Sequence, residues 1–409
     1  MPSGRGVVVF AAGIGLWIAA RIAGSTTLHM IAVGLTVLPF AAALFARSSR
    51  QRLRMRRRLS EARVRPGQRV GVELEVENQG SARASFLLLE DRLPPALGRS
   101  ARMVIAGLRP RERRRVTYTL TPSSRGRYTL GPLTADLSDP FALTRLRVEF
   151  DEREDLVVTP EIEELEGGPN APFGTTSGLA LSRHLFRTGD EFYTMRPYQT
   201  GDDLRRIHWP SVARSGELMI RQDESTRRST AVLFVDTRES AVGRTRTPAF
   251  EKAISAAASV GVLLVRYGFT LKVATTELPP QRTGEEGLLE LLAGLSHHQT
   301  RALSTGLTRL RIAAAADTTL AVVTAPPPPA ELASLIRAGQ VFGPKVAVLV
   351  HPTDPATLPP ERRAQLEGRA SQARTSMSRS GWEVLVIPPT GRLKDVWNAP
   401  RTRSLAVSG

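Results

Sequence analysis

Hydrophobic residues are most concentrated at the start of the chain, in two runs separated by a short polar break. The first run, Gly6 to Ala20, carries no charge until Arg21, and the second, Leu28 to Ala46, carries none until Arg47. A helix needs about 20 mostly apolar residues to cross the hydrocarbon core of a bilayer. The second run reaches that length, and the first does so if Arg21 extends to the interface. The pattern therefore predicts two transmembrane helices joined by a tight turn.

Arginines flank this hairpin at both of its ends. Arg5 precedes the first run. The second run is followed by Arg47, Arg50, Arg52, Arg54, Arg56, Arg57 and Arg58. Positively charged flanks stay cytoplasmic, so we expect residues 1–50 to anchor the chain in the cell membrane with its soluble domains in the cytoplasm. A cleaved signal peptide is the alternative for the first run, but a small-x-small cleavage site is missing and a full second span follows.

Apolar and polar residues alternate with period two after the arginine block. From Val70 to Val76 every second residue is apolar, and Val116 to Leu120 repeats the pattern. Short strands at roughly 10-residue spacing, with no helical segment between them, predict an all-β, immunoglobulin-like sandwich over residues 51–160. The segment has no histidine, and its acidic residues fall at alternating positions that we expect to be exposed. We therefore expect no catalysis there.

Continuous apolar strands alternate with helical segments from Thr230 onward. Ala231 to Val235 is entirely apolar, as is typical of a central parallel strand. Further strands are expected at 270–275, 319–323, 345–350 and 382–387, and helices at 249–267, 287–295, 302–315 and 361–380. This alternation predicts a doubly wound α/β domain over residues 230–390, followed by a C-terminal tail, 391–409. Pro326 to Pro329 predict a stiff loop.

Charge and composition exclude several classes of function. The net charge of +17 favours nucleic-acid binding at first sight. However, the arginines are spread over every segment, and aromatic residues make up 5%, which leaves few platforms for stacking bases. We expect no nucleic-acid partner but contact with anionic lipids of the inner leaflet, where a juxtamembrane arginine gains about 1 kcal/mol. The chain has no cysteine, which excludes disulfides, thiolate metal ligands and cysteine nucleophiles.

The segment that links the two soluble domains, residues 161–229, holds the densest set of polar and aromatic residues. The set comprises Arg196, Tyr198, Gly201, Asp202, Asp203, Arg205, His208, Trp209, Ser211 and Arg214. In one interpretation Asp202, Asp203 and His208 form the site of a metal-dependent hydrolase. In the other, the carboxylates pair with arginines in a network that sets the hinge and shapes a partner-binding surface. The excess of arginine opposes metal binding and favours the second interpretation.

The run from Arg196 to Leu218 resembles the signature of the family called domain of unknown function 58. The order of parts is also similar: a membrane hairpin, a β-rich segment, the signature, and then a von Willebrand factor A-like domain. The resemblance implies a bacterial membrane protein that works beside a MoxR-type AAA+ ATPase as an accessory or adaptor. It also implies no established enzymatic activity.

The von Willebrand factor A-like resemblance implies a metal site that can be compared residue by residue. The usual motif is Asp-x-Ser-x-Ser after the first strand, with a threonine and an aspartate from later loops, and its oxygen ligands suit magnesium. Asp236 and Ser240 match the motif, but Arg238 replaces the middle serine. Thr300 is the candidate threonine, and Ala325 stands where the aspartate belongs. We expect a degenerate site without metal, in which Asp236 pairs with Arg238 or caps a turn.

These observations favour a membrane-anchored, non-enzymatic scaffold or adaptor that needs no cofactor and binds a protein partner. His297 and His298 lack a third ligand nearby in sequence and are expected to be a solvated loop pair. A third hypothesis, an extracellular adhesin, requires the opposite topology and an intact metal site, and the sequence supports neither.

Overall fold

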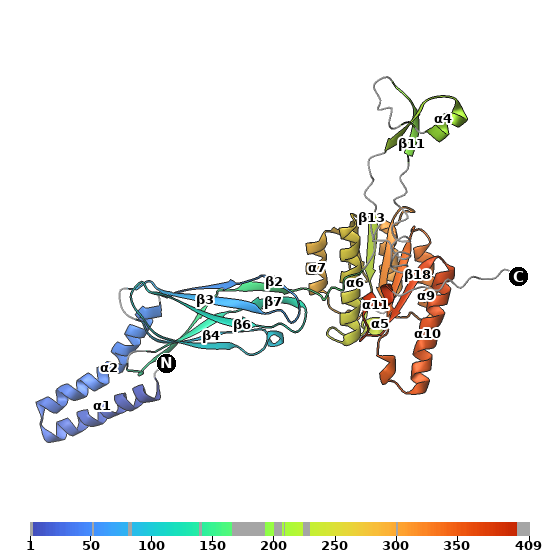
Figure 1. Ribbon diagram of the computed structural model, residues 1–409. Coiled ribbons are helices and arrows are strands. Elements are labelled where there is room, and N and C mark those ends of the chain that lie inside the picture. Colours follow the sequence, from blue (N-terminus) through green and yellow to red (C-terminus); the bar gives the residue numbers. More distant parts are fainter. Residues whose placement is uncertain are drawn as a thin grey trace. The chain divides into compact units, whose positions relative to one another are not determined.

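The structure is a computed structural model that describes residues 3–50, 53–80, 84–138, 141–165, 193–199, 207, 209–223, 230–299 and 302–398. The chain divides into two compact units, Met1–Thr159 and Pro160–Gly409 (Figure 1). The first unit contains two apolar helices and a β-rich region, and the second contains an α/β sheet with parallel strands. This coarse architecture is the one that the sequence predicts.

The two N-terminal helices, α1 (Gly4–Ala23) and α2 (Thr26–Arg50), form an antiparallel hairpin. Gly24 ends α1 in the left-handed conformation, with φ of 63°, where a side chain would be strained. Both helices are long and apolar enough to span a membrane. Helix α6 (Pro248–Arg266) also meets that criterion, but it is mostly buried in the α/β unit and is therefore a core helix.

Small residues form the contact between α1 and α2. Gly13 and Ala20 of α1, one heptad apart, are buried, and Ala32 of α2 is fully buried, whereas the buried Gly6 lies against the carbonyl of Leu143. A Cβ atom at Gly13 would lie 2.6 Å from Oγ1 of Thr36, so only glycine permits this approach of the two backbones. The large apolar side chains Val7, Val8, Ile14, Trp17, Ile18, Ile22, Met30, Ile31, Val33, Val37, Phe40 and Leu44 are exposed. This arrangement, small residues inside and large ones outside, suits a lipid environment.

The β-rich region consists of mainly antiparallel sheets that share one hydrophobic core. One sheet has the order β1-β3-β6 (Leu53–Leu59, Val70–Asn78 and Arg113–Leu120). A second has the order β5-β4-β8-β9 (Ala101–Leu108, Ala84–Asp91, Leu133–Ser138 and Arg145–Phe150). A smaller sheet joins β2 (Arg63–Val64), β10 (Glu154–Val158) and β7 (Gly126–Leu130), with β2 parallel to β10. The period-two alternation predicted for Val70 to Val76 places its apolar residues in this core.

Strand β1 accounts for part of the arginine block that the sequence analysis assigned to the membrane flank. Its exposed arginines face glutamates of β3, in the pairs Arg54–Glu77, Arg56–Glu75 and Arg58–Glu73. Arginines of β6 flank these glutamates from the other side. The glutamates therefore offset much of the positive charge that we had assigned to the lipid surface.

Arg57 and Asp91 form a buried ion pair inside the sandwich. Nε of Arg57 donates to Oδ2 of Asp91 at 3.1 Å, Nη2 donates to Oδ1, and Nη1 donates to the carbonyl oxygens of Leu130 and Glu152. The Tyr118 hydroxyl donates to Oδ2 of Asp91 at 2.6 Å. Burial, and then the neighbouring Asp91 carboxylate, raise the pKa of Tyr118 far above its usual value. The prediction that the acidic residues here are all exposed is thus wrong for Asp91. Its carboxylate is buried because the ion pair with the distant Arg57 offsets the loss of hydration.

The second unit is built on a six-stranded sheet of order β15-β14-β13-β16-β17-β18. The strands are Gln281–Thr283, Thr270–Thr275, Thr230–Val235, Thr319–Thr324, Lys345–Val350 and Trp382–Ile387, all parallel except β15. Alternate residues of β13 point to opposite faces. One face packs on α6, α7 (Glu285–Gly294) and α11 (Leu393–Trp397), and the other on α8 (Leu303–Leu310), α9 (Pro329–Gly339) and α10 (Pro360–Arg379). Because helices cover both faces of the sheet, residues 231–235 of β13 are all apolar and buried.

Three local predictions in this unit need correction. Residues 393–397 belong to the α/β domain and not to a tail that begins at 391, because α11 packs Leu393 and Trp397 into the hydrophobic core. The helix expected over 302–315 ends at Leu310, and a 3₁₀ turn, η4 (Arg311–Ala313), follows it. The prolines 326–329 are not simply a loop, because Pro329 is the first residue of α9. Proline suits that position, since the first helical N–H has no intrahelical partner to lose.

Candidate functional site

The candidate site lies at the carboxyl ends of β13 and β16, the two strands between which the order of the sheet reverses. β13 comes first along the chain in this sheet. The next two strands, β14 and β15, are added on one side of it, and β16, β17 and β18 are added on the other. In open α/β sheets, ligands bind beyond the carboxyl ends of the strands at such a switch point. Asp236 directly follows β13, Thr324 ends β16, and both side chains are buried.

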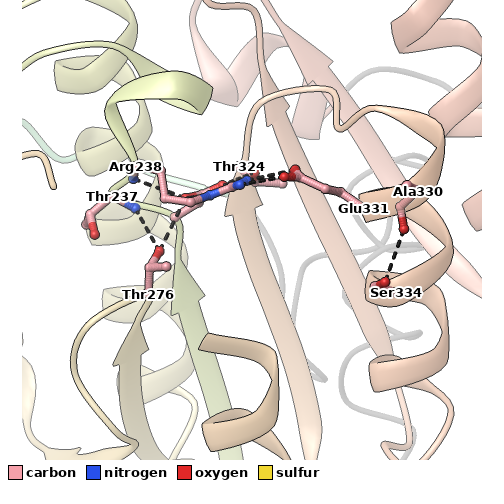
Figure 2. A network of polar contacts seen from close by, with 8 residues as sticks. Thr237, Arg238, Thr276, Thr324, Ala330, Glu331 and Ser334 are labelled. Carbon is pink, nitrogen blue, oxygen red and sulfur yellow. Dashed lines mark hydrogen bonds and ion pairs between the residues drawn. The ribbon is translucent and has the colours of Figure 1, made fainter. Parts of the chain in front are cut away.

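Arg238 is the central side chain of this site (Figure 2). Its Nε and Nη2 donate to Oδ1 and Oδ2 of Asp236, each at 2.9 Å. Its Nη1 and Nη2 also donate to Oε1 and Oε2 of Glu331, at 2.7 and 2.9 Å. The guanidinium thus lies between two carboxylates, and its side chain is 2% exposed, whereas that of Glu331 is 26% exposed. Glu331 belongs to the first turn of α9 and forms the outer side of the network.

Two threonines complete the hydrogen bonding of Asp236. Oγ1 of Thr324 donates to Oδ2 at 2.7 Å, and Oγ1 of Thr276 lies 3.3 Å from Oδ1. The backbone N–H of Arg238 donates to Oδ1 at 3.1 Å. Both oxygens of this fully buried carboxylate are therefore occupied by donors, which is what burial of a charge requires.

The electrostatics of the site favour a permanent internal cation. Burial alone lowers the pKa of Arg238, but hydrogen bonds and charges from Asp236 and Glu331 raise it above its usual value. The guanidinium therefore stays protonated at any ordinary pH. It fills the space between the two carboxylates where a metal ion would otherwise be attracted. Within the described ranges, no group of three or more histidine or acidic side chains is arranged to hold a metal ion.

The structure brings together some of the predicted site residues. The predicted pairing of Asp236 with Arg238 is present. Ser240 is exposed in the short helix α5 (Glu239–Val242), and Thr300 lies outside the described residues. Glu331 was missed, because it is 93 positions from Arg238 and follows prolines that indicated a loop. Its position in the first turn of α9, an acidic residue at a helix N-terminus, was the available signal.

The loop with the two histidines is bound to the site loop rather than simply solvated. Nδ1 of His297 accepts from the backbone N–H of Thr245 at 3.2 Å, and the backbone N–H of His297 donates to Oγ1 of Thr245 at 2.8 Å. The backbone N–H of His298 donates to the carbonyl of Thr237, and its carbonyl accepts from Glu239. The solvated-pair prediction holds for the exposed side chain of His298 but is wrong for the half-buried His297.

The described part of the signature segment is a small antiparallel hairpin with a helix. β11 (Tyr193–Pro197) pairs with β12 (Met219–Asp223), and α4 (Trp209–Ser215) precedes β12. The backbone N–H of Tyr198 donates to the carbonyl of Leu218 at 2.8 Å and continues the pairing. Trp209 is 66% exposed, Leu218 and Arg214 are also exposed, and Ser211 is half-buried.

Other predicted residues of this segment remain untested. Gly201, Asp202, Asp203, Arg205 and His208 lie outside the described residues, as does the side chain of Arg196. The hydrolase hypothesis, and the predicted pairing of these carboxylates with arginines, therefore remain predictions.

Two helices long and apolar enough to span a membrane, a β-rich region and an α/β sheet with a buried polar network fit a membrane-anchored protein of several parts. Residues 194–379 match a family described as "Protein of unknown function DUF58", which is less than half of the 409 residues. The match covers β12, the described part of the signature and most of the α/β sheet. It agrees with the resemblance noted in the sequence. No curated protein matches the chain.

Similarities to solved structures are weak. The CARDB domain of a Pyrococcus furiosus protein, a crystal structure with metal ions, is 18% identical. The alignment covers 26% of this chain and 91% of that domain, with a TM-score of 0.21. A Pseudomonas fluorescens alkylpurine DNA glycosylase bound to DNA is 11% identical, over 35% of this chain and 43% of that one, with a TM-score of 0.19. At these TM-scores neither similarity bears on fold or function.

Proposed function

We propose that this chain is a membrane-anchored scaffold or adaptor that binds a protein partner and catalyses no reaction. The observation that carries the proposal is the Arg238 guanidinium between Asp236 and Glu331. At the edge where an α/β sheet usually binds ligands, the polar groups are already satisfied by one another. An edge whose charges are neutralised internally favours a binding or structural role over a reactive centre.

The proposal includes two assignments of fold type. The α/β unit is a von Willebrand factor A-like domain, supported by its strand order, its short antiparallel strand β15, and Asp236 after the first strand. Its metal site is degenerate, since Arg238 supplies the positive charge. The β-rich region is an immunoglobulin-like sandwich, supported by its antiparallel sheets around one core.

The partner that we propose is an AAA+ ATPase of the MoxR type, which rests on the resemblance to the family. The contact surface that we propose includes the exposed Trp209 and Leu218 of the signature segment. Exposed tryptophan is a frequent anchor of protein interfaces because it buries a large apolar area. The arginines of the segment would contact acidic side chains at the rim.

The proposed location of the soluble parts is the cytoplasm. Since several arginines of the block belong to β1, the charges that orient the hairpin are Arg5, Arg47, Arg50 and Arg52. Because the two runs form a hairpin, the two ends that carry these arginines lie on the same side of the membrane, and positively charged flanks stay in the cytoplasm. A reporter that is active only outside the cytoplasm, fused after Gly409, should stay silent. Strong activity would contradict this topology.

The function is tested with the full chain, solubilised in detergent, and a purified MoxR-type ATPase from the same organism. We expect a complex that Trp209→Ala weakens, whereas Ile312→Ala, which removes another exposed apolar side chain, leaves it intact. The absence of a complex with the unaltered chain would refute the choice of partner. A hydrolytic activity that Asp202→Ala and His208→Ala abolish without loss of folding would refute the scaffold and support the hydrolase.

A further inference from the structure

The loop between β8 and β9 is fastened to the beginning of the first membrane helix. The backbone N–H of Ser3 donates to the carbonyl of Leu143 at 2.9 Å, and Oγ of Ser3 donates to the carbonyl of Ala142 at 2.6 Å. The glycine at position 6 permits this contact, because a Cβ atom there would collide with the Leu143 carbonyl. Ala142 has a φ of 55°, a conformation that an alanine rarely adopts. Helix α2 packs against β8 and β9 as well.

These contacts fix the height of the loop relative to a bilayer. Helix α1 has 20 residues, so at 1.5 Å per residue its length of about 30 Å equals the hydrocarbon thickness. Ser3, which caps α1, therefore lies at the boundary between hydrocarbon and headgroups. Phe141 is two residues from Leu143, so its backbone is within about 8 Å of that contact. This holds on whichever side of the membrane the helix begins.

The side chains of the loop suit this location. Phe141 is 64% exposed, so a large aromatic ring at this end of the sandwich would lie at headgroup level. Arg145 of β9 follows Phe141 by four residues, Arg5 of α1 follows Ser3 by two, and both arginines are exposed. Aromatic residues gather at headgroup level in membrane proteins, and arginines bind lipid phosphates there.

We propose that the segment 141–145 is a second membrane contact, in which Phe141 enters the headgroup region and Arg145 and Arg5 contact the phosphates of anionic lipids. The contact is continuous with the hairpin, because Ser3 joins the two through hydrogen bonds. It holds the sandwich domain against the bilayer instead of leaving it on a free tether. The proposal requires the membrane hairpin but not the partner proposed above.

The absence of cysteine from the chain permits a direct test with single labels. Phe141→Cys and Arg145→Cys each carry an environment-sensitive NBD fluorophore in full-length protein, at one copy per nanodisc of mixed neutral and anionic phospholipids. Val104→Cys is the matched control, because Val104 is 66% exposed on β5 of the same sandwich. We expect blue-shifted emission at both loop positions, quenching by lipids with a spin label in the headgroup, and protection from aqueous iodide. The control should show the opposite.

Emission and iodide quenching at position 141 equal to those at position 104 would overturn the proposal. A blue shift without quenching by the spin-labelled lipid would also overturn it, since protein would then cover the loop. The second label at 145 guards against a local effect of replacing the aromatic ring.

Discussion

Arg238 and Asp236, two residues apart, form a bidentate ion pair in which each guanidinium nitrogen lies 2.9 Å from its carboxylate oxygen. The pair is almost completely buried, and Glu331 closes it from outside. A charge of either sign left alone at this depth would be unfavourable by several kcal/mol. The three side chains therefore act as one unit, and removal of any of them has consequences for the others.

The first prediction concerns the stability of this unit. Asp236→Ala should lower the free energy of unfolding of the α/β unit by about 3–5 kcal/mol, because Arg238 remains buried with half of its partners. Glu239→Ala breaks the pair with the exposed Arg244 and should change little. Denaturant unfolding of the full chain, followed by the fluorescence of the buried Trp382 and Trp397, measures both. Equal effects of the two substitutions would contradict the role of Asp236.

The second prediction is that magnesium has no effect until the internal cation is removed. Magnesium and a chelator should give the same melting midpoint for the unaltered chain, since Arg238 occupies the space between Asp236 and Glu331. Arg238→Ser leaves the two carboxylates and Thr324 facing a vacant position with oxygen ligands. Its melting midpoint should rise with magnesium, because binding at 100 times the dissociation constant adds about 2.7 kcal/mol to the free energy of unfolding.

Arg244→Ser removes an exposed arginine near the same loop and is the control for this experiment. It should respond to magnesium no more than the unaltered chain does. A midpoint of the unaltered chain that shifts with magnesium would show that other residues complete a metal site. An unresponsive Arg238→Ser variant would show that the two carboxylates do not form a ligand set.

The third prediction concerns pH. His351 follows β17 and is 6% exposed, and within the described part of the chain its Nδ1 has no hydrogen-bond partner. Burial lowers the pKa of His351, although the charges of Glu367 and Asp354 raise it in part. The unfolded chain then binds a proton at higher pH than the folded one. The folded state is favoured while His351 is neutral. The free energy of unfolding is therefore highest above the ordinary histidine pKa of about 6.5, and it decreases as the pH falls toward the lowered pKa of the folded state.

The α/β unit should therefore become less stable between about pH 7 and pH 5, and His351→Asn should flatten this dependence. Unfolding midpoints measured across that interval for both proteins test it. His298→Asn is the control, because that side chain is exposed. A slope that His351→Asn leaves unchanged would assign the pH dependence to other groups.

The fourth prediction concerns the sandwich. Asp91→Ala removes the partner of the buried Arg57 and of the Tyr118 hydroxyl, so it should be unfavourable by about 3–5 kcal/mol. Glu77→Ala removes a carboxylate whose partner Arg113 is largely exposed, and it should have a small effect. Hydrogen exchange of the amides of β3 and β4, measured in the full chain, distinguishes the two. Similar protection in both variants would contradict the importance of the buried pair.

The elements that the sequence predicted well are those specified by local pattern. The apolar runs, the alternation from Val70 to Val76 and the apolar strand Ala231 to Val235 each depend on burial of neighbouring residues on known faces. The structure contains the corresponding helices and strands. The predicted pair of Asp236 and Arg238 also depends on residues that lie close together in the chain.

The features that the sequence analysis missed depend on distant partners. Arg57 points inward only because Asp91, 34 positions later, receives its guanidinium. In sequence it is one more arginine of a membrane flank. Glu331 joins Arg238 across 93 positions, and α9 begins at a proline that suggested a loop. Such pairs form only when the fold brings distant strands and helices together. The spacing of apolar and polar residues within one segment contains no information about them.

The last prediction tests the helix hairpin with two glycines of the same helix. Gly13→Val should separate α1 from α2, since its Cβ atom would lie 2.6 Å from Oγ1 and 2.9 Å from the backbone nitrogen of Thr36. Gly15→Val should be tolerated, because no atom lies within 4 Å of the corresponding position. Phe10 and Phe40 are in edge contact across the hairpin, with ring centroids 5.7 Å apart. Cysteines introduced at these two positions of the cysteine-free chain should therefore form a cross-link through a short bifunctional thiol reagent in nanodiscs, because the two side chains reach each other across the hairpin. Gly13→Val should reduce its yield and Gly15→Val should not, whereas equal yields in both would show that close backbone approach at Gly13 does not hold the helices together.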